Sequence, residues 1–286
     1  MRSAFELHRD YSVRFSRNTP FSGALKEYCE RHKLPDLNSN PMYAIAVAAL
    51  NEQVLLPRLL ASLNVAIRYS ALPIEVVVAD NGSSDATQEI ARTFGARLVV
   101  ETVRGIPVAR STALHNVSDS VRLVFSVDSD AVVPRRWIEN YLSHFRRNKN
   151  LIFAYGDMIP MFDFPPTESQ IASGAVISLG NYIARFIRVV RGVPMQPNSC
   201  NLVFNRSDAI EMGGYSRGIQ AGEENDLMKK LQPRGDTSYF LGMDVITSIR
   251  RKMGMGLWNW IKLACSKEFK GQNEPKPDGV YGVQYR

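Results

Sequence analysis

The sequence has few cysteines and no apolar run long enough to cross a membrane. Its three cysteines, Cys29, Cys200 and Cys265, are far apart and form no CxxC pair, so neither a disulfide framework nor a zinc site is predicted. No stretch reaches the roughly 18 apolar residues of a membrane-spanning helix, and the first residues lack the apolar core of a signal peptide. Together these absences predict a cytoplasmic protein.

Glycine-rich nucleotide motifs are also missing. Neither GxGxxG nor GxxxxGK[ST] occurs, which argues against a dinucleotide-dependent dehydrogenase and a P-loop NTPase. With 286 residues, 45% apolar and 22% charged, the chain can fold around a core without disulfides. Its net charge of +7 favours anionic partners such as nucleotide phosphates, acidic lipids or nucleic acid. The sequence contains no recognisable nucleic-acid-binding motif.

What the sequence does contain is a regular alternation of apolar strands and amphipathic helices. Strands are predicted over 43–50, 74–79, 97–101 and 123–127, with a helix in each interval. A repeat of this length predicts a parallel, right-handed, doubly wound α/β sheet. Further elements are expected as helices over 22–32 and 167–190, as strands over 153–157 and 244–249, and as a strand and turn over 198–206.

The strand over 123–127 ends in two carboxylates, Asp128 and Asp130. They would lie at the C-terminal edge of the sheet, where open α/β sheets bind their ligands. Oxygen ligands on a short turn suit Mg²⁺ or Mn²⁺, which keep coordination positions open for phosphate oxygens. The alternative interpretation is a turn or helix cap without a metal. Asp80 similarly follows the strand over 74–79.

Four motifs, in order, resemble the nucleotide-binding half of a family 2 glycosyltransferase of the GT-A fold. They are Ala49-Leu50-Asn51-Glu52, the segment 78–87 around Asp80, Arg104-Gly105 with Ala109-Arg110, and Asp128-Ser129-Asp130. The resemblance covers about residues 42 to 252. It implies a Rossmann-like, mostly parallel sheet flanked by helices, with an acceptor-side subregion.

The resemblance also implies roles for individual residues. Asp80 would bind the nucleotide base, Arg110 the nucleotide and Asp128 the ribose. Asp130, with Asp128, would bind Mn²⁺ or Mg²⁺ on the diphosphate. The remaining residues expected at the nucleotide are Ala49, Leu50, Glu52 and Ser129. Asp80 as a plain turn residue and Arg110 as a solvated helix residue are the alternatives.

An acidic motif in the second half is similar to the start of the family's acceptor-side helix. Glu223-Glu224-Asn225-Asp226-Leu227 follows Gly213-Gly214-Tyr215, as Glu-Asp-x-Asp-Leu follows a Gly-Gly-aromatic element in the family. The resemblance makes Glu224 the catalytic base, where the family has Asp. Because of this departure, Glu223 and Asp226 remain competitors. Alternatively, the three acids only complement the positive end of a helix.

Two basic segments complete the predicted organisation. The resemblance suggests that Arg250 and Arg251 close over the donor diphosphate; a solvated loop is the alternative. The basic, aromatic segment 257–270 favours peripheral association with the inner face of a membrane, or packing on the domain or on a second subunit of a homo-oligomer. We therefore divide the chain into an arm (1–41), a glycosyltransferase domain (42–252, with halves 42–134 and 135–252) and a tail (253–286).

The sequence thus predicts a metal-dependent, inverting glycosyltransferase. Its donor would be a nucleoside-diphosphate sugar, with a UDP-sugar favoured. Its acceptor would be a hydroxyl of a glycan, a lipid-linked sugar, a protein or a small molecule. The alternatives are a catalytically silent GT-A-like binding module and a nucleotidyltransferase; the latter usually carries a glycine-rich basic loop after its first strand, which this chain lacks.

Overall fold

The computed structural model describes residues 21–37, 39–161, 197, 200–219 and 222–248. By its internal contacts the chain forms two units, Met1–Pro160 with Met195–Thr247, and Met161–Pro194 with Ser248–Arg286. Almost all described residues belong to the first unit. The predicted helix over 167–190 and the basic segment 257–270 lie outside the described residues, and the predicted domain boundaries stay predictions.

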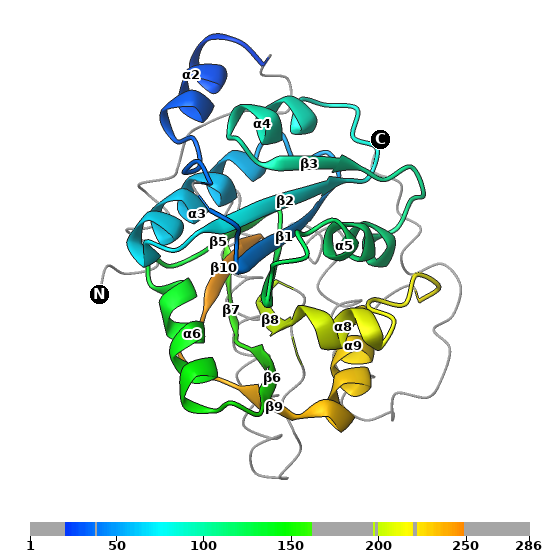
Figure 1. Ribbon diagram of the computed structural model, residues 1–286. Helices are drawn as coiled ribbons and strands as arrows, with labels where there is room; N and C mark the ends of the chain where they lie inside the picture. Colours follow the sequence, from blue (N-terminus) through cyan, green and yellow to red (C-terminus); the bar gives the residue numbers. More distant parts are fainter. Residues whose placement is uncertain (1–20, 38, 162–196, 198–199, 220–221, 249–286) are drawn as a thin grey trace. The chain divides into compact units, whose positions relative to one another are not determined.

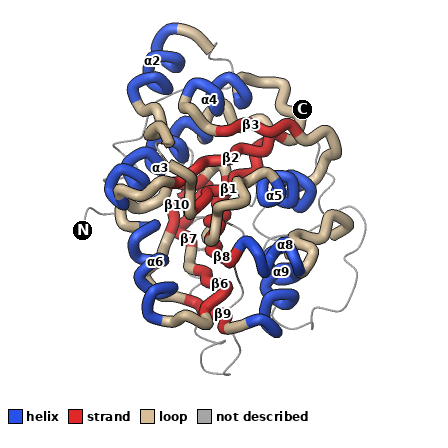
Figure 2. The backbone as a smooth tube through the Cα atoms, in the orientation of Figure 1, coloured by secondary structure: helices blue, strands red, loops and turns tan. Residues whose placement is uncertain are grey.

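A seven-stranded sheet forms the centre of the first unit, as Figures 1 and 2 show. Its order is β3-β2-β1-β4-β8-β6-β9. Neighbouring strands among the first four are parallel, and β8 runs antiparallel to both β4 and β6. The strands are β1 (Tyr43–Ala49), β2 (Ile74–Asp80), β3 (Arg97–Val100), β4 (Leu123–Asp128), β6 (Leu151–Tyr155), β8 (Leu202–Asn205) and β9 (Asp236–Tyr239). The predicted mostly parallel α/β sheet is confirmed.

Helices cover the two faces of this sheet (Figure 1). One side carries α3 (Leu56–Ser70) and α6 (Trp137–Arg147), and the other carries α5 (Ile106–His115), α8 (Arg206–Glu211) and α9 (Glu223–Leu231). Further described elements are α2 (Gly23–Arg31), α4 (Thr87–Thr93), the 3-10 turn η1 (Gln232–Arg234), and a small sheet of β5 (Ala131–Val132), β10 (Val245–Ser248) and β7 (Met158–Met161). Because helices lie on both faces, the central strands read as continuous apolar runs.

Aromatic packing fixes α6 against the strand that carries the two carboxylates. The Trp137 ring lies 5.2 Å from that of Phe125 on β4, and the Tyr141 ring lies 6.2 Å from it, centroid to centroid. All three side chains are fully or almost fully buried. Burial of each aromatic side chain contributes on the order of 1.5–3 kcal/mol. This packing gives the end of β4 a rigid support.

Strand register brings the acidic strand ends together. Ala49 on β1 pairs with Asp80 on β2, and Ala48 pairs with Asp128 on β4. The chain moves outward from β1 to β3 and then returns to the other side of β1 to form β4. Ligands of open α/β sheets bind at the carboxyl ends of strands where the strand order reverses in this way. Asp80 and Asp128 flank that position.

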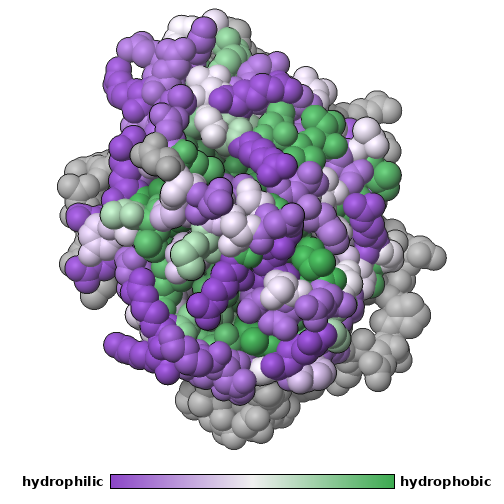
Figure 3. Space-filling model, viewed as in Figure 1, coloured by the Kyte–Doolittle hydropathy of each residue, from purple (hydrophilic) through white to green (hydrophobic). Residues whose placement is uncertain are grey.

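Two properties of the surface bear on function. Within the described ranges, every helix is too short or too polar to cross a membrane. The face seen in Figure 3 is mostly hydrophilic, with apolar side chains in scattered patches.

Candidate active site

The loops that follow β1 and β2 are tied to each other. The backbone N–H of Asn51 donates to Ser83 Oγ at 2.8 Å, and the N–H of Ser84 donates to Asn51 Oδ1 at 2.9 Å. Asn51 has a positive φ of 55°, a conformation that Asn adopts more readily than most residues. The N–H of Glu52 donates to Thr87 Oγ1 at 2.8 Å. These hydrogen bonds hold the loops after β1 and β2 in a fixed position relative to each other.

The predicted nucleotide residues of the first strand differ in their exposure. Ala49 is buried in β1 and Glu52 is buried in the loop, whereas the Leu50 side chain is 40% exposed. The backbone carbonyl oxygen of Glu52 accepts from the N–H groups of Leu55 at 3.1 Å and Leu56 at 2.9 Å. The Glu52 backbone therefore leads into α3, which begins at Leu56, and of the three residues the Leu50 side chain is the exposed one.

Asp80 ends β2 with a fully buried side chain. Its Oδ2 accepts two hydrogen bonds, from the backbone N–H of Ser83 at 3.1 Å and from Gln88 Nε2 at 2.8 Å. Its Oδ1 is buried and has no hydrogen-bond partner in the described part of the chain. Buried polar atoms are normally paired, so this oxygen is a candidate acceptor for a ligand N–H. Gln88 was not predicted from the sequence.

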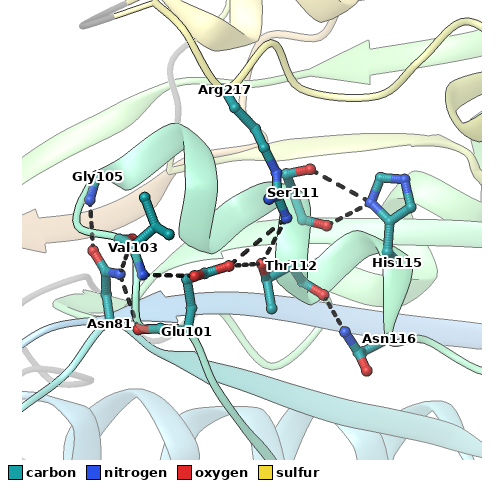
Figure 4. Close-up of polar contacts among 9 residues, drawn as sticks. All are labelled: Asn81, Glu101, Val103, Gly105, Ser111, Thr112, His115, Asn116 and Arg217. Carbon is teal, nitrogen blue, oxygen red and sulfur yellow. Dashed lines mark hydrogen bonds and ion pairs between the residues drawn. The ribbon is translucent and has the colours of Figure 1, made fainter.

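The loop between β3 and α5 is organised around Glu101 (Figure 4). The carboxylate accepts from Thr112 Oγ1 at 2.5 Å and from the backbone N–H of Val103 at 2.7 Å. Arg217, from the loop after α8, reaches it at 3.7 Å. The hydrogen bond from Thr112 is the largest cause that lowers the pKa of Glu101 below its ordinary value. Glu101 therefore remains ionised and holds the loop down onto α5.

Asn81 fixes the other side of the same loop (Figure 4). Its side-chain nitrogen donates to the carbonyl of Val103 at 2.7 Å, and its Oδ1 accepts from the N–H of Gly105 at 2.8 Å. Gly105, the N-cap of α5, has a φ of 145°, which an L side chain rarely adopts. The start of α5 is therefore fixed from β2, and the position of Arg110 within that helix is fixed with it.

Arg110 joins the donor-side and acceptor-side acids. It is 5% exposed, and its Nη2 and Nη1 donate to Asp128 Oδ1 and to Glu223 Oε1 in short ion pairs. Burial alone would lower the pKa of Arg110, but the charges of Asp128, Glu223 and Glu224 outweigh burial and raise it. The end of β4 and the start of α9 therefore meet around one permanently charged guanidinium.

Asp130 has a different environment from Asp128. It is 5% exposed, and its Oδ1 accepts from Thr247 Oγ1 on β10 at 2.9 Å. Ser129 between the two acids is also buried. The Asp128 side chain is 24% exposed, so it is the more accessible acid. The turn is therefore held from two sides, by α5 through Arg110 and by β10 through Thr247.

The chemistry of this turn fits a divalent cation that is completed by a substrate. Two carboxylates two residues apart offer the oxygen ligands that Mg²⁺ and Mn²⁺ prefer. In the described ranges, no three His, Cys, Asp or Glu side chains gather as a metal site. A cation here would need further oxygens from water and phosphate, which is how Mg²⁺ is usually bound.

The three acids at the start of α9 are held differently. Glu223 is buried against Arg110, and Glu224 is half-buried. Asp226 Oδ2 lies 2.9 Å from Lys230 Nζ. Burial raises the pKa of Asp226, but hydrogen bonds involving Lys230 and Ser216 outweigh this effect, and the net shift is downward. A carboxylate with a lowered pKa is a weaker proton acceptor.

A buried asparagine that was not predicted connects α6 with the segments around β6, β8 and β10. The Asn201 side chain is fully buried and accepts at Oδ1 from Trp137 Nε1 and Tyr141 Oη, both at 2.9 Å. Its nitrogen donates to the carbonyl of Asp157 at 2.8 Å and to that of Met243. Asn201 thus links α6, β8 and the segments that follow β6 and precede β10. Asn201 stands between Asn198-Ser199-Cys200 and the apolar residues of β8, and nothing in that local sequence indicates this role.

The structure places most of the predicted residues at one edge of the first unit. Asp80, Asp128, Asp130 and Ser129 lie at or just after strand ends, and Arg110 joins Asp128 to Glu223. Near the start of α4, the Asp85 carboxylate accepts from the Thr87 N–H at 3.0 Å. Arg250 and Arg251 lie outside the described residues.

A family model for glycosyl transferase family 2 matches residues 44–208, more than half of the chain. The matched range includes the strand ends with Asp80 and Asp128 and the helix α5 with Arg110, and it stops before the acidic start of α9. A sequence search among curated proteins gave no match.

Solved structures of similar fold include residues 1–349 of S. aureus TarS, with a TM-score of 0.53 at 13% identity. The alignment covers 79% of this chain and 65% of the TarS fragment, so this chain spans less than two thirds of the length of that fragment. A mannosyltransferase, PcManGT from Pyrobaculum calidifontis, solved with GDP-Man and Mn²⁺, gives a TM-score of 0.58 at 18% identity, covering 93% of this chain and 73% of that one. GalNAc-T7, solved with UDP, GalNAc and Mn²⁺, gives a TM-score of 0.51 at 12% identity. That alignment covers 75% of this chain and 47% of GalNAc-T7.

Proposed function

The chain belongs to glycosyl transferase family 2, and we propose that it transfers a sugar from a nucleoside-diphosphate sugar, with a UDP-sugar favoured, to an acceptor hydroxyl. The proposed reaction depends on Mn²⁺ or Mg²⁺ and inverts the anomeric carbon. Nucleotide and Mn²⁺ complexes of PcManGT and GalNAc-T7, which share the fold, support this donor class.

One observation carries the proposal. Arg110 is buried between Asp128, at the end of β4, and Glu223, at the start of α9. A glycosyltransferase needs its donor site and its proton acceptor within one substrate's reach, because bond breaking and bond making occur at the same carbon. The shared arginine therefore holds the start of α9, where the proposed base Glu224 follows Glu223, against the end of β4 on the donor side.

On the donor side we propose that Asp80 binds the nucleobase and that Asp128 binds the ribose. Asp130, together with Asp128, would bind the cation on the diphosphate. Leu50 presents an exposed apolar side chain beside Asp80's strand end, while Ala49, Glu52 and Ser129 shape the site from buried positions. A bound Mn²⁺ or Mg²⁺ would neutralise negative charge that increases on the diphosphate as it leaves. Arg110 contributes a fixed positive charge beside the ribose-binding carboxylate.

On the acceptor side we propose that Glu224 is the general base of the reaction. Its carboxylate takes the proton of the acceptor hydroxyl while that oxygen bonds to the anomeric carbon, and the electron pair of the breaking bond leaves with the diphosphate. The family resemblance assigns the base to Glu224, and the lowered pKa of Asp226, which pairs with Lys230, makes Asp226 a weaker base. Inversion follows because a single displacement needs no protein nucleophile.

Sugar transfer with purified protein tests the two central assignments. Glu224→Gln keeps size but removes the base, and we expect transfer to fall by about 10² to 10⁴ while UDP binding is retained. Asp130→Asn keeps an oxygen for Thr247 but loses charge, and both metal-linked binding and transfer should be lost. Glu89→Gln, at an exposed position on α4, is the control and should leave both unchanged.

Each outcome has a distinct meaning. Full transfer activity in Glu224→Gln would move the base to another acid. Nucleotide binding without transfer in the wild type, for every donor and acceptor tried, would favour the silent binding module.

A further inference from the structure

The carboxylate of Asp80 is asymmetric in a way that bears on nucleotide choice. A free carboxylate offers two oxygens and about four lone-pair positions. In Asp80, Oδ2 already accepts from Ser83 N–H and Gln88 Nε2, at 3.1 and 2.8 Å. Oδ1 is buried and, among the described residues, has no partner. Asp80 therefore has one oxygen whose hydrogen-bonding positions are unfilled by the described residues, where an unconstrained aspartate would have two.

The orientation of Gln88 is fixed by its own neighbours. Its Oε1 accepts from Arg92 Nη2 at 3.3 Å, one turn further along α4. The amide oxygen therefore faces Arg92, and the amide nitrogen faces the carboxylate of Asp80. An amide nitrogen donates and an amide oxygen accepts, so this direction gives the hydrogen bond from Gln88 Nε2 to Asp80 Oδ2.

Nucleobases differ in how many adjacent donors they present to a carboxylate. Uracil presents one ring N–H between two carbonyl groups. Guanine presents two neighbouring donors, the ring N1–H and the exocyclic N2–H, which pair with both oxygens of an open carboxylate. Cytosine and adenine present a ring nitrogen lone pair that a carboxylate repels. One open oxygen therefore matches uracil and leaves one donor of guanine unpaired, which costs affinity when the site is buried.

We propose that Gln88 is a specificity-determining residue: by occupying Asp80 Oδ2 it leaves a single acceptor, which selects a uracil-type base and disfavours guanine. This inference rests on the proposed nucleotide-sugar function and narrows its donor. Asp80 Oδ1 accepts the ring N–H, and Gln88 acts through Asp80 by blocking the position that the second guanine donor needs.

The first test uses the unmodified protein and three nucleotides, UDP, GDP and IDP, with Mn²⁺. IDP carries a purine with the N1–H but without the N2 amino group. If the unpaired donor is what disfavours guanine, the Kd should rise in the order UDP, IDP, GDP, with a gap of about tenfold between IDP and GDP. Equal affinity for IDP and GDP, or tighter binding of GDP than of UDP, would overturn the inference.

The second test removes the block. Gln88→Met keeps the length of the side chain and loses its N–H donor, so Oδ2 regains an open position. We expect the Kd for GDP to fall about tenfold, the Kd for UDP to change little, and the IDP–GDP gap to close. Gln88→Ala should act in the same direction, and Glu89→Ala, the exposed neighbour on α4, should leave all three constants unchanged.

The melting temperature without ligand shows whether each variant is folded. A folded Gln88→Met protein whose UDP to GDP preference equals that of the wild type would refute the role of Gln88 while leaving the proposed function in place. Failure of the wild type to bind any of the three nucleotides would instead remove the proposed function, and this inference with it.

Discussion

At the scale of single residues, the feature with the largest consequence is the burial of Arg110 between two carboxylates. A buried charge is tolerated only when it is paired and hydrogen-bonded. Asp128 and Glu223 each accept from one nitrogen of the guanidinium. Either acid without Arg110 would be left as an uncompensated negative charge beside the other.

Arg110→Ala should therefore destabilise the fold strongly. We expect the free energy of unfolding to fall by about 3–5 kcal/mol, the usual cost of leaving a buried partner unpaired. Urea denaturation checks this value. Arg217→Ala is the matched control, because its side chain is 57% exposed and 3.7 Å from Glu101, and such pairs contribute about 0–1 kcal/mol. Equal losses in the two variants would contradict the buried-pair argument.

A single substitution can also test which of the three acids of α9 acts as the general base. Asp226→Asn removes the ion pair with Lys230, which lies 2.9 Å away and also donates to the Gly214 carbonyl at 2.9 Å. We expect sugar transfer by this variant to keep the pH dependence of the wild type and to lose less than about tenfold in rate, because the residue positions a loop and does not take the proton. A loss as large as that of Glu224→Gln would identify Asp226 as the base.

At the scale of elements, the loop between β3 and α5 links a titratable group to stability. The pKa of Glu101 is lowered, chiefly by the hydrogen bond from Thr112. A carboxylate with a lowered pKa in the folded state contributes stability above its unfolded pKa of about 4.3, and this contribution is lost as the pH falls through the folded value.

Thr112→Val should remove most of that contribution. At pH 7 we expect the free energy of unfolding to fall by about 1.5–3 kcal/mol, the range for a hydrogen bond to a charged group. The difference from the wild type should narrow as the pH falls from about 4.3 through the lowered pKa of Glu101 in the folded wild type, and it should vanish once Glu101 is protonated in both proteins. Denaturation curves at several pH values measure this difference in the free energy of unfolding. Thr102→Val, a substitution at an exposed position, is the control. A difference that is independent of pH would contradict this role for Glu101.

The connection after β6 is equally sensitive to packing. A Cβ added at Gly156 would lie 2.4 Å from the carbonyl oxygen of Met243 and 2.6 Å from Asn201 Nδ2. Both contacts are too short, and the buried Asn201 is held by four neighbours' groups and cannot move freely. Gly156 is therefore required by the close approach of two segments.

Gly156→Ala should destabilise the protein by about 1–3 kcal/mol, as overpacking commonly does. Thermal or urea denaturation measures the loss. Gly218→Ala is the control, because a Cβ there meets nothing within 4 Å and the position has no left-handed backbone. If Gly156→Ala left the free energy of unfolding unchanged, the segment after β6 and the segment before β10 could move apart without loss of stability.

At the scale of the whole molecule, ligand binding should report on the entire first unit. A ligand that binds only the folded state at 100 times its Kd adds about 2.7 kcal/mol of stability. We therefore expect UDP with Mn²⁺ to raise the melting temperature by several degrees. Removal of the metal with a chelator, or Asp130→Asn, should abolish most of this rise. A rise that is unaffected by both would contradict the metal-dependent donor site.

The sequence by itself determined the sheet and its functional edge. Apolar runs of strand length separated by amphipathic helices predicted β1 to β4, their parallel order and the acidic ends that carry Asp80 and Asp128. These features are local, since a strand's burial and its terminal residues are written in a few consecutive positions. The family resemblance rested on the same segments, and the family match over residues 44–208 confirmed it.

Only the tertiary structure decided which side chains meet. Arg110 contacts Glu223 across a separation of 113 residues, and Asp130 contacts Thr247 across 117. Gln88 is only eight residues from Asp80, yet no periodic pattern indicates that its amide faces that carboxylate. Periodicity shows which face of an element is buried, whereas a polar contact depends on the register and packing of two elements together. The partners of each acid, which separate their proposed roles, therefore follow from packing.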